Sequence, residues 1–292
     1  MKTSTHNCVD DVSITLSAEK IIEVVTSKTE LTWGALIDTA FDHSQVKKRL
    51  NLESAVNCYD FLPLRGLTAV APCLISLSPD SNLRTQVTRL IRHCQGRPML
   101  SFFGSTESLR EISERWREVH TVSVVDGQEM LLRFADTRVL SYTQKVLTSQ
   151  QWAGICGAIS HWLYFDRSGG LVKCDIPSLN EQREKILITK DQLEKFLDES
   201  YPDALIALIT ESMCEIFPTG TSASERYYVI KDSYELSKKH EINNSADVLA
   251  LAVGACLTEG KSNVDQRLES LLRQRTWSTG LLGDAMVNAE IL

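Results

Sequence analysis

The stretch LLRFADTRVL, residues 131–140, carries three charged side chains within an otherwise largely apolar run. These side chains are Arg133, Asp136 and Arg138, and leucines stand at both ends of the stretch. Charges in an apolar region are costly unless they are paired or hydrogen-bonded. The stretch is therefore a catalytic constellation, a ligand clamp or an internal brace of the fold.

Local patterns favour a strand, then a helix cap, then a helix. Asp136 stands at the N-cap position of a predicted helix, where its loss would cost about 1 kcal/mol. Arg138, in the first helical turn, opposes the helix dipole, so we expect it to have an acidic partner or a packing role. The guanidinium of Arg133 needs an acceptor, and we expect Asp38 or nearby backbone carbonyls to provide it.

A β-hairpin is predicted just before this stretch. Asp126-Gly127 suits a two-residue type I′ turn between the strand-like runs TVSVV and QEMLLRF. Such a turn pairs residues 125 and 128 and places His120 opposite Arg133. Both faces of the hairpin are apolar, which predicts that it is covered on both sides.

The rest of the chain predicts an α+β fold in two lobes. Residues 1–180 should form a mixed α/β lobe with a central sheet flanked by helices, and residues 181–292 an all-α lobe. Strands are expected at 31–38, 73–78 and 98–105, and helices at 17–27, 82–94 and 105–116. The helical lobe should begin with a capping box formed by Thr189 and Gln192.

Composition excludes several classes of protein. The formal net charge is -7; residues up to Asp175 carry 19 basic and 19 acidic side chains, and the remainder 12 basic against 19 acidic. This balance argues against nucleic-acid binding by the second lobe. We find no signal peptide and no apolar run long enough to span a membrane, so we expect a cytoplasmic protein. The eight cysteines form no CxxC pair and should be reduced thiols.

No catalytic, nucleotide-binding or metal-binding motif occurs, so we expect no catalytic residue, no cofactor and no metal. Cys156 with His161 is the one candidate for a nucleophile and its base, but a small packed thiol explains Cys156 more simply. Trp162 and Tyr164, on a late strand, are candidates for a partner-binding surface, because Trp and Tyr are frequent in interfaces.

An ordered set of segments resembles the effector adaptor/chaperone family of bacterial type VI secretion systems. The segments are WGALIDTAFD (33–42), APCLISL (71–77), MLSFFGSTESLREISERWREV (99–119), DGQEMLLRFADTRVL (126–140), GAISHW (157–162) and ITKDQLEKFLDESYPDALIALITE (188–211). Asp38, Arg133, Asp136 and Arg138 fall on the family's structural signature. Ala135 and Thr137 replace its usual aromatic residue and proline, and Thr137 gives up a preorganised helix start.

The resemblance implies a non-enzymatic cytoplasmic protein that binds a toxic effector and promotes its loading onto a VgrG-type spike. Its partners would be the effector, encoded nearby, and the spike protein. Two alternatives stay open on the sequence alone: a cysteine-dependent hydrolase using Cys156, and an immunity-like protein that binds a toxin to protect against it.

Overall fold

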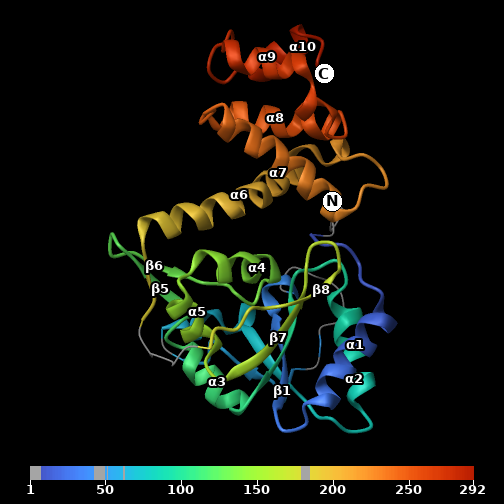
Figure 1. The fold of residues 1–292 in the computed structure, drawn as a ribbon, viewed down its shortest axis with the longest axis vertical. Coiled ribbons are helices and arrows are strands. Elements are labelled where there is room, and N and C mark those ends of the chain that lie inside the picture. Colours follow the sequence, from blue (N-terminus) through green and yellow to red (C-terminus); the bar gives the residue numbers. More distant parts are fainter. Residues whose placement is uncertain (1–7, 43–49, 51, 62, 179–184) are drawn as a thin grey trace. The chain divides into compact units, whose positions relative to one another are not determined.

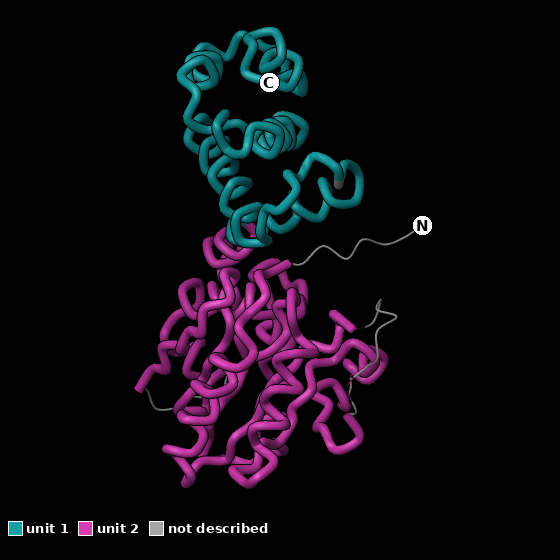
Figure 2. The backbone as a smooth tube through the Cα atoms, turned by 90° about the vertical axis from the view of Figure 1, so that its right-hand side faces the viewer, with its two compact units in different colours: residues 1–6, 198–292 teal, residues 7–197 magenta. Residues whose placement is uncertain are grey.

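The computed structural model describes residues 8–42, 50, 52–61, 63–178 and 185–292. The described chain forms two compact units, one within residues 8–197 and one of residues 198–292, shown in different colours in Figure 2. The first is a mixed α/β unit and the second is helical, so the expected fold class is confirmed. The expected boundary near residue 180 falls outside the described residues.

A six-stranded sheet is the centre of the mixed unit. Its strands, in sheet order, are β2 (Val56–Asn57), β3 (Pro72–Leu77), β1 (Thr32–Asp38), β4 (Leu100–Ser105), β7 (Ile159–Phe165) and β8 (Leu171–Lys173). All of these neighbouring pairs are antiparallel. The three strands expected from the sequence are confirmed, with ends shifted by at most two residues. β1 lies between β3 and β4, and only its first residue is not fully buried.

Helices cover both faces of this sheet (Figure 1). They are α1 (Ile14–Ser27), α2 (Leu83–Cys94), α3 (Leu109–Trp116), α4 (Thr137–Val146) and α5 (Ser149–Cys156), with short 3-10 helices η1 (Thr39–Asp42) and η2 (Leu64–Val70). Alternate β1 side chains enter different cores: Ala35 and Ile37 pack with α1 and α2, whereas Leu36 packs with α3, α4 and α5. Asp38, two residues after Leu36, lies on the same face of β1 as Leu36.

The predicted hairpin was wrong in two respects: its strands pair one residue away from the predicted register, and it is not covered on both faces. β5 (Thr121–Val124) and β6 (Glu129–Leu131) form a separate three-stranded sheet with β9 (Leu187–Ile188), in the order β6-β5-β9. Val124 N–H donates to the Gln128 carbonyl at 2.8 Å, which makes a three-residue loop. Only Gly127 in that loop has positive φ, whereas a type I′ turn needs two such residues.

The shift of one residue places His120 beside Leu132 rather than Arg133. All three residues of β6 are exposed, so the hairpin is not covered on both sides. Arg133 therefore lies beyond the strand, in the segment that connects β6 to α4.

The second unit consists of helices packed around its own apolar core. Its elements are the end of α6 (Lys190–Met213), η3 (Cys214–Ile216), α7 (Ala223–Lys239), α8 (Ser245–Leu257), η4 (Lys261–Val264), α9 (Gln266–Gln274) and α10 (Leu282–Asn288). α6 begins in the mixed unit with the expected capping box: Gln192 N–H donates to Thr189 Oγ1, and Thr189 N–H to Gln192 Oε1. Among the described helices, none is long and apolar enough to cross a membrane.

A buried arginine in the mixed unit leaves room only for glycine at one position. The Arg115 guanidinium is paired with Glu107 and packs against Gly157, the residue that ends α5 at φ 53°. A Cβ atom at this position would overlap the Arg115 side chain, and positive φ is itself unfavourable for other residues.

Gly157→Ala should therefore lower the free energy of unfolding by about 2–4 kcal/mol. Chemical denaturation followed by circular dichroism measures this loss. Gly66→Ala is the matched control, because an added Cβ there meets no atom within 4 Å, and it should change stability by less than about 0.5 kcal/mol. Equal effects of the two substitutions would contradict the packing account.

Candidate functional site

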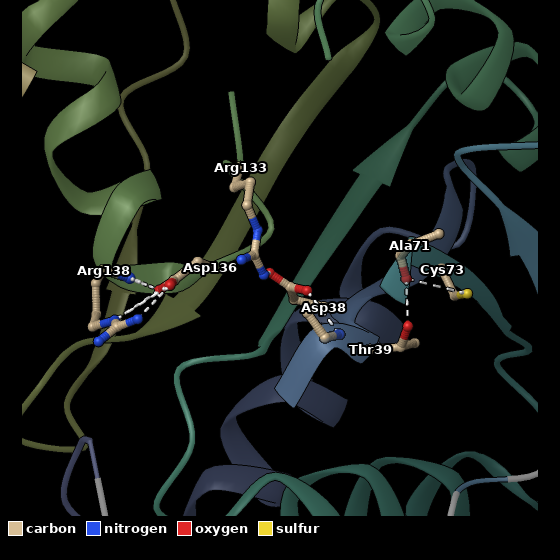
Figure 3. Close-up of polar contacts among 8 residues, drawn as sticks. Asp38, Thr39, Ala71, Cys73, Arg133, Asp136 and Arg138 are labelled. Atoms are coloured by element: carbon tan, nitrogen blue, oxygen red, sulfur yellow. Dashed lines mark hydrogen bonds and ion pairs between the residues drawn. The ribbon is translucent and has the colours of Figure 1, made fainter. Parts of the chain in front are cut away.

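The signature residues Asp38, Arg133, Asp136 and Arg138 gather at one end of β1 (Figure 3). Arg133 Nη2 donates to Asp38 Oδ2 at 2.6 Å, which confirms the expected pair. The Asp38 side chain is 1% exposed and that of Arg133 is 43% exposed. The pair therefore joins a buried carboxylate to a cation that is partly in solvent.

Backbone geometry holds the Asp38 carboxylate in place. Asp38 N–H donates to the Met99 carbonyl at 3.0 Å, and Asp38 Oδ1 accepts from Ala40 N–H at 3.1 Å. The hydroxyl of Thr39 donates to the Ala71 carbonyl at 2.7 Å, which ties the start of η1 to the start of β3. Burial raises the Asp38 pKa, and the neighbouring Arg133 opposes that effect without cancelling it.

Asp136 acts as the N-cap of α4, as expected. Its Oδ1 accepts from the Arg138 N–H at 2.9 Å, and its carboxylate pairs with the Arg138 guanidinium at 2.7 Å. Arg138 also lies over the Phe41 ring, 5.6 Å from its centroid. Since Thr137 N–H donates to the Pro98 carbonyl, the start of α4 is fastened to the segment before β4. Arg138 thus has both the acidic partner and the packing role predicted for it.

An aromatic cluster lies behind the signature. Phe134, directly after Arg133, is completely buried and stacks on His120 with ring centroids 5.1 Å apart. Tyr59 and His120 form a T-shaped pair with ring centroids 5.0 Å apart. Neither ring nitrogen of His120 has a hydrogen-bond partner in the part of the chain that the structure describes, and burial lowers its pKa to about 3. His120 is therefore a neutral aromatic of the core.

The structure places Trp162 and Tyr164 in the core instead of on a surface. Trp162 is completely buried between Trp116 and Trp152, whose rings stack on it at 5.7 and 5.6 Å, and its indole N–H donates to Ser101. Tyr164 is 4% exposed. A partner cannot contact an enclosed side chain, so we correct the expected partner-binding role of both residues. β7 is not an edge strand at this point, because it lies between β4 and β8.

Cys156 does not have the surroundings of a nucleophile. Its thiol is buried, and burial raises its pKa. The seven cysteines whose side chains are described are free thiols. In the described residues, no three His, Cys, Asp or Glu side chains gather closely enough to hold a metal ion.

A second ionic cluster was missed by sequence reasoning. Asp42 Oδ2 lies 2.9 Å from His93 Nε2, and the Arg97 guanidinium contacts Asp42 Oδ1. These partners lower the Asp42 pKa although burial acts in the opposite direction. The cluster links η1 to the end of α2. Only the basic ending of the predicted helix, Arg92-His93, hinted at it.

Comparison with known proteins matches one part of the chain to a protein family. Residues 33–154 match the family model of a domain of unknown function, DUF4123. The DUF4123 match runs from β1 to α5 and contains all four signature residues, whereas Trp162 and Tyr164 lie beyond it. No curated protein and no solved structure matches the chain. These four residues brace the end of β1 against the start of α4.

Removing the cation of the buried pair should reveal its role. Arg133→Gln leaves the Asp38 carboxylate buried without its counter-charge, so we expect a loss of about 1–3 kcal/mol in unfolding free energy at pH 7. The Asp38 pKa should rise further above its unfolded value. The folded variant then takes up a proton as the pH falls, so its deficit relative to the unsubstituted protein should shrink between pH 7 and pH 4.5.

Urea unfolding at several pH values measures this difference. Arg110→Gln is the matched control, because Arg110 forms an exposed pair with Glu114 and should change stability by less than about 0.5 kcal/mol. A deficit of Arg133→Gln that is the same at every pH would show that Asp38 is not its origin.

Proposed function

We propose that the chain is a non-catalytic cytoplasmic adaptor that binds a toxic type VI secretion effector and promotes its loading onto a VgrG-type spike. The DUF4123 match over residues 33–154 carries this proposal, together with the ordered segments that resemble the adaptor family. The arrangement of the signature supports it, because the charged residues that suggest an active site form ion pairs with one another, Arg133 with Asp38 and Arg138 with Asp136.

A binding role needs exposed apolar surface, and the three-stranded sheet offers some. Met130 and Leu131 of β6 are 42% and 40% exposed, the turn residue Val125 is 64% exposed, and Leu187 of β9 is 54% exposed. β6 also stands at the edge of its sheet. Exposed edge strands accept an additional strand from a partner, with backbone hydrogen bonds for affinity and side-chain contacts for specificity. We assign effector binding to this edge.

Co-expression with a toxin encoded by a neighbouring gene should yield a stable complex. We expect the two proteins to co-purify and to elute together from a sizing column. Leu131→Lys, a charge on the open edge, should weaken the complex without lowering the melting temperature. Leu16→Lys changes an exposed leucine on α1, which is 61% accessible against 40% for Leu131, and should leave the complex intact.

The competing functions give different results in the same strains. Deletion of the gene should abolish export of the effector, whereas self-killing on deletion would identify an immunity protein. An activity that Cys156→Ala destroys without unfolding the protein would identify a cysteine hydrolase. If no complex forms with the neighbouring toxin, the adaptor proposal fails.

A further inference from the structure

A cavity of about 390 Å³ lies within the helical unit, which contains none of the four signature residues. This volume is within the range of roughly 300–1,000 Å³ that is typical of small-ligand pockets. Its walls include the apolar side chains of Phe217 and Val229, the thiol of Cys256, and the charged side chains of Glu225, Arg226 and Glu259. No residue of the β1 ion pairs or of the edge strand β6 lines this cavity.

Local structure forms this cavity in advance of any guest. One wall is the loop 217–221, which connects η3 to α7, and the others are the first turns of α7 and the end of α8. The Ser222 hydroxyl and the Glu225 side chain form a capping box that fixes the start of α7. The Asn263 side-chain amide donates to the Val229 carbonyl at 3.1 Å, which holds η4 against α7.

The lining combines apolar surface with excess negative charge. Two carboxylates, Glu225 and Glu259, and one cation, Arg226, line the cavity, and the Arg226 guanidinium lies 5.3 Å from the Phe217 ring centroid. Outside the lining, Lys261 Nζ lies 3.6 Å from Glu259 Oε2, but both side chains are exposed, so this pair is weak and leaves the carboxylate open to competition. Burial raises the Cys256 pKa to about 11, so its thiol is neutral and acts as an apolar wall. The surrounding unit is also acidic, because residues 198–292 contain 15 acidic and 8 basic side chains.

Two exposed apolar residues are sequence neighbours of lining residues. Tyr228, which precedes Val229 in α7, is 52% exposed, and Leu257, which follows Cys256 in α8, is 54% exposed. A hollow with an apolar floor, carboxylates and apolar neighbours fits an amphipathic cation: a hydrocarbon stem can cover Phe217 and Val229 while its charged head stays at the carboxylates.

We propose that this cavity binds an arginine side chain of a partner protein, presented by a segment with apolar flanking residues. Arginine suits the two carboxylates because its planar guanidinium donates several hydrogen bonds in fixed directions. The excess negative charge of the unit attracts such a segment and speeds its encounter. The inference rests on the proposed function only in taking the guest to be part of a protein.

A short peptide tests the cavity without the effector. The probe is the pentapeptide Leu-Gly-Arg-Gly-Leu with both ends blocked, titrated into the full-length ¹⁵N-labelled protein. We expect shifts of the Thr219 and Gly220 amide signals, which line the cavity, and binding about tenfold weaker when citrulline replaces the peptide's arginine.

Two matched double variants each remove two negative charges, one inside the cavity and one outside it. Glu225→Gln with Glu259→Gln should weaken binding about tenfold or more while keeping the fold, because glutamine also completes a capping box. Glu241→Gln with Glu290→Gln removes two charges from exposed residues outside the cavity, both with the positive φ of Glu259, and should leave binding unchanged. Equal binding of the citrulline peptide, preference for a peptide with glutamate in place of arginine, or no shift at Thr219 and Gly220 would each overturn the proposal.

Peptide binding and effector binding have independent outcomes. A peptide that binds as expected to a chain that forms no effector complex would remove the adaptor function and keep the arginine site. An effector complex without peptide binding would keep the adaptor function and remove the arginine site.

Discussion

The ion pair between Asp38 and Arg133 is the constraint on which the mixed unit depends. Asp38 ends a strand that is buried on both faces, and a carboxylate cannot remain charged there without a counter-charge and hydrogen-bond donors. Arg133 meets this need from a segment almost a hundred residues away in the sequence. The contact therefore fixes where the chain must pass between β6 and α4.

Two further contacts extend this constraint to neighbouring elements. Asp136 caps α4 and holds Arg138 over Phe41, so the residues that follow β1 pack against the start of α4. Phe134, between the two charged positions, enters the aromatic cluster with His120 and Trp116. One short stretch thus supplies an ion pair, a helix cap and a core side chain. Because these side chains are occupied in bracing the fold, partner binding must use other surfaces. We assign it to the exposed edge of β6 and to the cavity of the helical unit.

Sequence patterns predicted the elements and the brace for clear physical reasons. The apolar run of β1, the periodicity of α2 and the Thr189 capping box are local signals, and each appears where expected. The pairing of Asp38 with Arg133 was predictable because an unpaired charge at the end of a buried strand is so unfavourable. The order of the segments along the chain carried the resemblance to a known family.

Other features depended on information that a single sequence does not contain. A three-residue turn and a two-residue turn both suit Asp126-Gly127, yet they differ by one residue in register, which changes the partner of His120. Trp162 lies in the middle of a Trp stack that only the folded sheet assembles. The grouping of Asp42 with His93 and Arg97, and the cavity beside α7, likewise arise from residues far apart in the chain.

Asp38 and Arg133 stabilise the fold through each other. A double-mutant cycle with Asp38→Asn, Arg133→Gln and the combined variant measures this directly, by urea unfolding at pH 7. We predict a favourable coupling energy of about 1–2 kcal/mol between the two positions. Additive effects, with a coupling energy within about 0.3 kcal/mol of zero, would contradict the account.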